Sequence, residues 1–468
     1  MKVTESEMKC RKLHKGGCSQ RVSAELKGYA KAHDSQKIIE TELTDTARLL
    51  EQIVDRDNMN KAFKKVKKNK GSGGVDGMET EELLLYLKEH GQDLVQEIMI
   101  GKYRPKPVRR VLIPKEEKGK VRELGIPTVV DRVVQQAIAQ VLNPMFEVQF
   151  SDKSYGFRPG RSAHDAMKHC KRAIDSGRRY IVDMDLEKYF DTVSHSKLIE
   201  VLSRTIKDGR VISLIHKYLN SGVIVNHTFR ETRMGVPQGG PLSPLLSNIM
   251  LNELDKELDK RGHDYVRYAD DLMIFVRSKR SAKRVLESTT AFIEKRLFLK
   301  VNKEKTRVDS CVKVKFLGFG FYIYKSKAKF RVHPKAISRM KSEVSRLTAR
   351  RSGLSNDIRP KKLKRFITGW INYFKLADMK KLLVKVDEWM RRRIRMVIWK
   401  QWKKIKTRFK NLQKLGIPKP KAWEYANTRK GYWRIASSPI LQRSISNARL
   451  KSRDYIFFSD YYNQVRVN

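Results

Sequence analysis

The chain alternates between segments of helical and of strand periodicity over most of its length. Apolar residues at three-to-four-residue spacing predict helices over 131–147, 196–221 and 281–297. Compact apolar runs predict strands at Val111–Ile113, Val121–Ile126, 180–186 and 316–324. A polar turn is expected to join the first two strands. The pattern is that of a globular chain, and 468 residues are enough for more than one domain.

The segment GVPQGGPLSPLLSNIML (235–251) joins a turn-forming loop to an amphipathic helix. Ser243 is a suitable helix cap, and Pro244 suits the first helical position because its missing N–H is not needed there. The helix is expected to bury one apolar face, made of Leu245, Leu246, Ile249, Leu254 and Leu258.

A second amphipathic pattern covers 386–412 and predicts one basic helix. There is no acidic residue between Trp389 and Trp423, so the face opposite the apolar stripe is Arg and Lys. A basic amphipathic helix also suits an anionic membrane or calmodulin. Because this one continues a large globular chain, we expect it to pack on a core and to present its basic face to a nucleic acid.

The stretch RYADDLMIF (267–275) places two adjacent carboxylates, Asp270 and Asp271, inside an apolar run. Neighbouring strand residues point to opposite faces, so a tight turn with both aspartates at its tip explains the pattern better than a continuous strand. Asp185, in VDMDLEKYFD, is the best candidate for a third carboxylate. Such a set suits Mg²⁺, and two ions could activate a 3′-hydroxyl; Mn²⁺ could substitute. The alternative is an ordinary Asp-Asp surface turn.

The net charge of the chain limits the class of binding partner that we expect. It carries 101 Lys and Arg against 51 Asp and Glu, a formal net charge of +50. A polyanion, most simply nucleic acid, is the expected partner; a cationic ribosome-associated protein is the alternative. The segment 64–77 adds five lysines beside four glycines, which predicts a mobile loop that either contacts phosphates or merely links helices. No apolar run is long enough to span a membrane and no targeting signal is evident, so we expect a cytoplasmic protein.

The order of several motifs resembles the sequence blocks of a reverse transcriptase. These are RRVLIPK, R-x-LGIPT, SYGFRPGRSAHDA, VDMDLEKYFDTV, GVPQGGPLSPLLSNIML, RYADD, VNKEKT and FLGFGF. The glycine loop at 71–77 falls where enzymes of the group II intron lineage carry an extra N-terminal block, and GWINYF (369–374) resembles their maturase domain. The resemblance covers about residue 49 to the C-terminus.

This resemblance implies an α+β fold, a right-hand polymerase whose fingers and antiparallel palm sheet precede a helical thumb. The implied domains are an N-terminal extension (1–48), fingers (49–179), palm (180–328), thumb or maturase domain (329–425) and a basic DNA-binding-like tail (426–468). Related proteins with a DNA endonuclease carry paired Cys-x-x-Cys elements near the C-terminus. The last cysteine here is Cys311, so we expect no second-strand cleavage by this chain.

The resemblance also implies roles for single residues. Asp185 and Asp270 would be the principal metal ligands, with Asp271 less demanding, and Phe190 would exclude the 2′-hydroxyl of an rNTP. The implied dNTP contacts are Lys115, Arg122, Phe190, Gln238 and Lys305. The implied primer grip is Phe316, Leu317 and Gly318. Lys303 is close enough to Lys305 to leave that assignment open, and the register around Lys115 and Arg122 is also open.

RNA contacts are expected from the basic residues around GWINYF and along 386–412, while the aromatic residues pack a core. The candidates are Lys361, Lys362, Lys364, Arg365, Arg391, Arg392, Arg393, Arg395, Lys403 and Lys404. The expected partners are group II intron RNA, a DNA target or primer and dNTPs, with no membrane; the oligomeric state is open. The leading hypothesis is a group II intron reverse transcriptase and maturase. The alternatives are a domesticated polymerase in DNA repair or defence, and an RNA-binding maturase without polymerase activity.

Overall fold

The computed structural model describes residues 47–114, 119 and 121–467. The chain divides into two compact units, one formed by residues up to Met145 together with Ser194–Ser243, the other by Phe146–Val193 and Pro244 onward. Each unit combines sheets with helices, so the expected α+β class is confirmed. The bounds of the five domains proposed from the sequence stay predictions.

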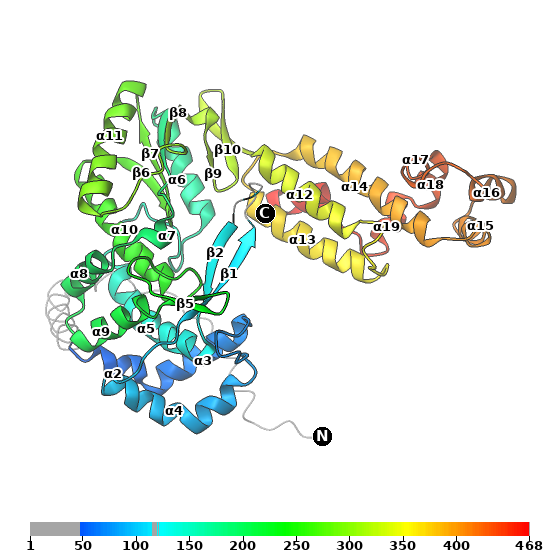
Figure 1. Ribbon diagram of the computed structural model, residues 1–468. Helices are drawn as coiled ribbons and strands as arrows, with labels where there is room; N and C mark the ends of the chain where they lie inside the picture. Colours follow the sequence, from blue (N-terminus) through cyan, green and yellow to red (C-terminus); the bar gives the residue numbers. More distant parts are fainter. Residues whose placement is uncertain (1–46, 115–118, 120, 468) are drawn as a thin grey trace, which may run out of the picture. The chain divides into compact units, whose positions relative to one another are not determined.

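The first unit consists of six helices, counting most of α5, and one four-stranded sheet in the described part of the chain (Figure 1). The helices are α2 (Leu49–Val54), α3 (Arg56–Asn69), α4 (Leu83–Met99), α5 (Val129–Glu147), α8 (His195–Thr205) and α9 (Gly209–Leu219). The strands are β1 (Val108–Pro114), β2 (Val121–Ile126), β4 (Val223–Val225) and β5 (Thr228–Arg230), in the order β2-β1-β4-β5. Strands β1 and β2 form the predicted antiparallel pair, in which Ile113 lies opposite Arg122.

The predicted helix over 196–221 is in fact two helices, α8 and α9. The break follows from Asp208, whose carboxylate accepts hydrogen bonds from the backbone N–H of Arg210 at 3.0 Å and of Leu50 at 3.1 Å. Asp208 therefore caps α9 and attaches it to α2, which an uninterrupted helix could not do.

The glycine loop is more firmly held than the sequence suggested. The guanidinium of Arg109 donates to the carbonyl of Gly73 at 2.7 and 3.2 Å, and Arg132 donates to the carbonyl of Ser72. A Cβ added at Gly74 would lie 2.6 Å from the Cα of Thr128, so glycine is required for this close approach. The loop therefore packs against the start of α5 instead of extending as a free linker.

The second unit contains an antiparallel sheet in the order β6-β7-β3-β8. Its strands are β3 (Tyr180–Met184), β6 (Asp264–Tyr268), β7 (Asp271–Val276) and β8 (Arg307–Ser310). The surrounding helices are α6 (Ala163–Asp175), α7 (Tyr189–Thr192), α10 (Ser243–Lys260) and α11 (Lys279–Arg296). The predicted apolar face of α10 is confirmed, since all five of its apolar residues are buried.

A three-stranded antiparallel sheet follows, in the order β11-β10-β9. Its strands are β9 (Lys315–Phe316), β10 (Phe319–Tyr324) and β11 (Lys327–Val332), and a short 3-10 helix, η1 (Cys311–Lys313), precedes them. The predicted strand 316–324 is thus interrupted at Leu317 and Gly318, whose φ angles of 49° and 81° are incompatible with a continuous strand.

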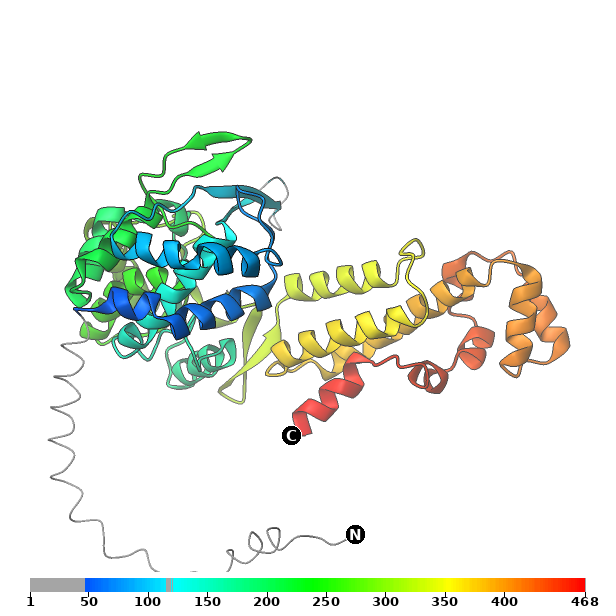
Figure 2. The same ribbon diagram turned by 90° about the horizontal axis from the view of Figure 1, so that it is seen from below.

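The rest of this unit is helical, and α12 and α20 each lie against α13 and α14 (Figure 2). The helices are α12 (Pro334–Leu347), α13 (Ile358–Phe374), α14 (Lys380–Gln401), α15 (Ile405–Lys414), α16 (Lys419–Ala426), α17 (Tyr432–Ile435), α18 (Pro439–Ser444), α19 (Asn447–Lys451) and α20 (Phe458–Val467). The predicted helix over 386–412 is broken between α14 and α15, where Arg408 donates to the carbonyl of Trp402 at 3.0 Å. Within the described residues, no helix combines the length and apolar character needed to cross a bilayer.

Candidate active site

The two aspartates of RYADD lie at the hairpin between β6 and β7. Tyr268 pairs with Asp271, so the two-residue tip is Ala269 and Asp270, and Asp271 is the first residue of β7. The expectation that both aspartates occupy the tip is wrong by one position. Ala269 has a φ of 58°, a left-handed conformation that an alanine adopts at a cost of about 1–2 kcal/mol. Contacts elsewhere must hold this turn.

A buried polar network supplies those contacts. The guanidinium of Arg267 donates to the Asp255 carboxylate at 2.5, 2.8 and 2.9 Å, to Asn248 Oδ1 at 3.0 Å and to the carbonyl of Ala269 at 3.0 Å. Asp255 and Asn248 both lie on α10, so this helix fixes the turn through Arg267. The network explains why a charged residue belongs in β6.

The SYGFRPG loop also packs on the turn. Asn248 Nδ2 donates to the carbonyl of Gly156 at 2.9 Å. A Cβ added at Gly156 would lie 2.2 Å from the backbone nitrogen of Ala269, far inside van der Waals contact. Gly156 is therefore required for the loop and the turn to meet, and it can be counted among the supports of the site.

Asp185 follows the last residue of β3. It therefore lies at the same end of the strands as the β6–β7 turn. Met184 pairs with Leu272, and continuing this antiparallel register by one residue places Asp185 beside Asp271. The Nζ of Lys305 lies 3.4 and 3.5 Å from the two carboxylate oxygens of Asp185. This contact favours Lys305 over Lys303 as the lysine next to the site.

The electrostatics of Asp271 reflect this crowding of acids. Its side chain reaches the surface, yet the surrounding protein excludes much of the water near its carboxylate. This burial, and then the negative charges of Asp270, Asp183 and Asp185, raises the pKa of Asp271 to about 6. In the part of the chain that the structure describes, no group of three or more His, Cys, Asp or Glu side chains is close enough together to hold a metal ion. Carboxylate oxygens are nevertheless the donors that Mg²⁺ prefers.

Phe190 lies on α7, directly after the strand that ends near Asp185. The neighbouring Tyr189 is 2% exposed and donates through its hydroxyl to the carbonyl of Ser247 on α10 at 3.0 Å. The two rings meet edge to face with centroids 5.2 Å apart. Tyr189 thus anchors α7, and Phe190 is held half-buried beside it.

The other predicted nucleotide contacts belong to the first unit. Arg122 is exposed on β2, and the carbonyl of Gln238 accepts a hydrogen bond from the backbone N–H of Gly125 at 2.7 Å. Gly239, with a φ of 133°, approaches the same strand so closely that a Cβ would lie 2.4 Å from the carbonyl oxygen of Gly125. The Gln238 loop therefore packs on the strand that carries Arg122. Lys115 lies outside the described residues.

The predicted primer grip is a turn supported by the GWINYF helix. The hydroxyl of Tyr373 on α13 donates to the carbonyl of Leu317 at 3.0 Å, and the ring of Phe374 would lie 3.2 Å from a Cβ added at Gly318. Phe316 is buried at 4% exposure in the core below. Phe366, Trp370 and Phe374 of α13 therefore pack on the core as predicted, whereas Tyr373 is 39% exposed and, together with Phe374, fixes the backbone of this turn.

The predicted RNA-contacting residues divide by exposure. Six of them are exposed on α13 or in the turn after α14: Lys361, Lys362, Lys364, Arg365, Lys403 and Lys404. Arg391, Arg392 and Arg393 are half-buried. Arg395 is 7% exposed and donates to the carbonyl of Ile445 at 2.9 Å and to Asn447 Oδ1 at 3.0 Å. The structure gives no support to Arg395 as an RNA contact, because its guanidinium serves the packing of the C-terminal helices.

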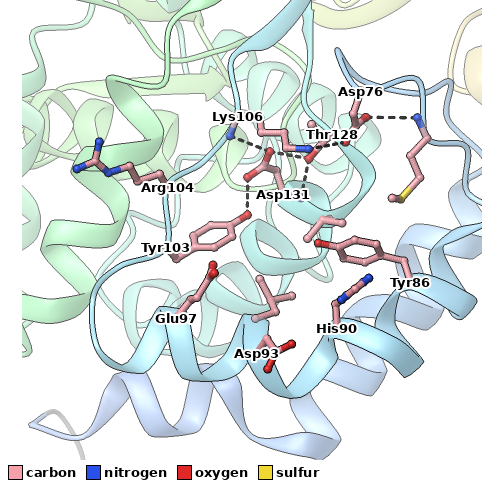
Figure 3. Close-up of a pocket in the computed structure, with 13 residues that line it drawn as sticks. Asp76, Tyr86, His90, Asp93, Glu97, Tyr103, Arg104, Lys106, Thr128 and Asp131 are labelled. Atoms are coloured by element: carbon pink, nitrogen blue, oxygen red, sulfur yellow. Dashed lines mark hydrogen bonds and ion pairs between the residues drawn. The ribbon is translucent and has the colours of Figure 1, made fainter.

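A cavity of about 340 Å³ lies in the first unit, lined from α4, the segment before β1 and the start of α5 (Figure 3). Its central acid, Asp131, is 1% exposed and accepts hydrogen bonds from Tyr103 at 2.7 Å and Thr128 at 2.6 Å. Burial raises the pKa of Asp131, and these hydrogen bonds oppose the shift. The cavity contains none of the predicted catalytic residues, and Asp131 ties α5 to the chain entering β1.

The residues that support the turn were not predicted from the sequence. Arg267 and Gly156 stood inside quoted motifs but carried no assigned role, and Asp255 and Asn248 lay on a helix interpreted only through its apolar face. The sequence did contain one signal of this network: a charged residue, Arg267, stands inside the buried strand β6 and requires a polar partner. The identity of that partner requires the three-dimensional structure.

Comparison with known proteins agrees with this geometry. Residues 113–321 match the family model described as reverse transcriptase (RNA-dependent DNA polymerase), and residues 337–416 match that of the group II intron, maturase-specific domain. Protein YkfC of Escherichia coli is 36% identical over 301 residues, which cover 56% of this chain and 79% of that protein. The group II intron-encoded protein LtrA of Lactococcus lactis is 31% identical over 344 residues, which cover 60% of this chain and 57% of that protein.

The chain therefore belongs to the reverse transcriptases of group II introns, a family of RNA-directed DNA polymerases with a maturase domain. Reverse transcriptases generally use divalent metal ions, and a maturase domain implies binding of intron RNA. The match spans little more than half the length of LtrA, so the activities of that whole protein are not carried over to this chain.

Proposed function

We propose that the protein binds a group II intron RNA, assists its splicing and copies it into DNA from a DNA primer with dNTPs. The observation that supports the catalytic part is the strand register: Asp270 lies at the hairpin tip, Asp271 begins β7, and the β3–β7 pairing places Asp185 beside Asp271, with Lys305 in contact with Asp185. The bacterial cytoplasm is the proposed location, by analogy with the bacterial relatives.

Carboxylate oxygens are the donors that Mg²⁺ prefers, and a bound ion would draw the Asp185, Asp270 and Asp271 carboxylates, which are not close enough together without it, into one site. A bound divalent ion supplies Lewis acidity at the 3′-hydroxyl and at the leaving phosphate oxygens. Lys305 would donate to the triphosphate, and Arg122, Gln238 and Lys115 would contribute further contacts to the nucleotide. Phe190 would leave no space beside the 2′ carbon of the sugar, which favours dNTPs.

The primer would rest on the turn at Phe316, Leu317 and Gly318. Exposed lysines and arginines of α13 and of the turn after α14 would contact the phosphates of the intron RNA. Binding the folded RNA in preference to its unfolded forms stabilises the splicing-competent state by mass action, so the protein can assist splicing without chemistry of its own.

The test is primer extension on an RNA template with dNTPs and Mg²⁺. Asp270→Asn and Asp185→Asn should each lower the rate about a hundredfold or more, because several kcal/mol of transition-state stabilisation are lost. Asp309→Asn is the matched control: Asp309 lies on the neighbouring strand β8 and pairs with Arg307 at 3.8 Å. Each variant is first shown to unfold at the same urea concentration as the parent.

Two outcomes would change the proposal. No extension by the parent, with tight binding of structured RNA, would favour a maturase without polymerase activity. Equal losses in Asp309→Asn and Asp270→Asn would show that the loss is general and not located at the hairpin. Splicing of an intron-containing transcript, with and without the protein, tests the maturase part separately.

A further inference from the structure

A second hollow of the molecule, of about 780 Å³, lies in the helical region of the second unit. It is lined from the loop after α12, from one face of α14 and from α17, which lies against α14 (Figure 1). We call it the basic-aromatic pocket and define it by six of its residues: Arg350, Arg351, Arg393, Lys400, Trp433 and Arg434. Lys400 and Arg393 are seven residues apart on α14, which places them on the same face.

The charge of this pocket is unbalanced. The residues that line it include four arginines and a lysine and no acid. Within the described residues, no carboxylate forms an ion pair with Arg350, Arg351, Lys400 or Arg434. Like charges gathered around one hollow repel each other, so an anion in it would be favoured. Arg393 is less available to bind an anion than the other four basic residues, because it already donates to Thr348 at 2.7 Å and to the carbonyl of Ser345 at 3.0 Å.

The pocket also presents a fixed aromatic ring. The guanidinium carbon of Arg392 lies 3.9 Å from the ring centroid of Trp433, and Arg392 donates to the backbone carbonyl of Trp433 at 2.9 and 3.1 Å. Trp433 is nevertheless 39% exposed. A large aromatic ring that is held in place and still open to solvent loses little conformational freedom when a ligand stacks on it.

The neighbouring tyrosine fixes the wall of the pocket. Tyr432 packs against Met396, Val397 and Ala436, and the guanidinium of Arg350 lies 5.5 Å from its ring centroid. The wall of the hollow formed by Tyr432 and Trp433 is therefore held in place by contacts with α14 and with Arg350.

We propose that the basic-aromatic pocket binds an unpaired nucleotide of a single-stranded nucleic acid. The base stacks on Trp433, and the phosphates on either side of it contact Arg350, Arg351, Lys400 and Arg434. Stacking on an aromatic ring combined with cations along the backbone is how proteins bind single strands, whereas a paired base is stacked inside its duplex and cannot enter. The inference rests on the proposed function to the extent that the single strand is intron RNA.

Binding is measured by fluorescence anisotropy with a twelve-nucleotide single-stranded RNA of mixed sequence, without dNTPs. Trp433→Ala should weaken binding about five- to hundredfold, the range found when one stacking aromatic is removed. The matched control is Trp423→Ala: Trp423 is 58% exposed on α16, lies in the same helical region and does not line the pocket. Its loss should leave binding within about twofold of the parent.

The phosphate contacts are tested through the salt dependence of the same measurement. Replacing Arg350 and Arg351 together by Gln should reduce the slope of log K against log salt by about 1.4, since each phosphate contact on a single strand contributes about 0.7. The control is Arg284→Gln, an exposed arginine on α11, for which the slope should stay unchanged. Trp433→Ala should change the affinity and leave the slope as it is.

Three probes distinguish which nucleic acid supplies the bound nucleotide: single-stranded RNA, single-stranded DNA and a blunt duplex. RNA and DNA single strands of the same sequence show whether the 2′-hydroxyl matters, and dependence on Trp433 in either supports the pocket. Equal effects of Trp433→Ala and Trp423→Ala, or equally strong dependence on Trp433 with a blunt duplex, would overturn the proposal. These measurements need no polymerisation, so a parent protein inactive in primer extension would overturn the polymerase proposal and leave the pocket standing.

Discussion

Arg267 and Asp255 form an ion pair in which the two side chains are 1% and 0% exposed, and the same guanidinium holds the carbonyl of Ala269 at the tip of the hairpin. The pair joins α10 to the residue that precedes Asp270. Its position explains how a turn with a left-handed alanine can be kept in one geometry next to the predicted catalytic carboxylates.

Arg267→Met should destabilise the protein strongly. It leaves the Asp255 carboxylate buried without its partner, which costs about 3–5 kcal/mol. Urea unfolding of the parent and the variant measures this. The double variant Arg267→Met/Asp255→Leu removes both charges and should recover most of the stability, since an apolar pair of similar volume is often neutral.

The double variant also separates positioning from folding. Although stable, it still lacks the donor to the Ala269 carbonyl, so we expect the kcat of primer extension to stay about tenfold to a hundredfold below the parent. Full recovery of both stability and kcat would mean that Arg267 serves the core alone.

Gly156→Ala should damage the site while sparing the rest of the fold. The added Cβ would lie 2.2 Å from the backbone nitrogen of Ala269, so either the loop or the turn must move. A displacement of about 1 Å near the reacting groups can cost about a hundredfold in rate. Single-nucleotide incorporation measures this, and circular dichroism checks the fold.

The matched control for that variant is Gly91→Ala. Gly91 lies inside α4, where an added Cβ meets nothing within 4 Å. Alanine in a helix interior should stabilise by about 0.5–1 kcal/mol and leave incorporation unchanged. A Gly156→Ala protein that incorporates nucleotides as fast as Gly91→Ala would show that the loop yields without disturbing the turn.

The sequence was sufficient for features governed by local pattern. The β1–β2 strand pair, the buried face of α10 and the packing of Phe366, Trp370 and Phe374 on α13 all follow from periodicity and are confirmed. Errors arose where a single residue breaks the pattern through a distant contact. Asp208 interrupts the predicted helical stretch by capping the start of α9 and by accepting a hydrogen bond from the backbone N–H of Leu50, and periodicity carries no information about such a partner.

The candidate site shows the same limit. The acids at Asp185 and Asp270 were selected from their motifs, yet the residues that set the hairpin come from α10 and from the SYGFRPG loop. Arg395 shows the converse, because a run of basic residues was expected to face RNA while this one is buried against Ile445 and Asn447. Charge runs identify a class of partner, but burial decides which members of the run can reach it.

Phe190→Ala should relax sugar selection. Phe190 is held beside Tyr189, whose hydroxyl is bonded to α10, so the large side chain cannot easily move aside for a 2′-hydroxyl. Removing it should reduce the preference for dCTP over CTP by about 10- to 200-fold, the range expected for steric discrimination in a pocket. The ratio of the two kcat/KM values is the measurement. Phe190→Tyr keeps the bulk and should keep the preference; if Phe190→Ala also keeps it, another residue acts as the gate.

Tyr373→Phe should weaken primer binding more than it lowers the stability of the protein. The variant removes the hydroxyl that donates to the Leu317 carbonyl, in a turn where Leu317 has a φ of 49°. Loss of one hydrogen bond at a partly exposed site costs about 0.5–1.5 kcal/mol of stability. The larger effect should be on the turn itself, raising the KM for primer about fivefold while kcat changes little, since a difference of about 1 kcal/mol in positioning corresponds to that factor.

The matched control is Tyr461→Phe. This variant removes another tyrosine hydroxyl, one that is bonded at 3.3 Å to Asn372 on α13, and it should leave the KM for primer unchanged. Steady-state extension at varied primer concentration distinguishes the two variants, and an equal rise in KM for both would show that the turn does not depend on Tyr373.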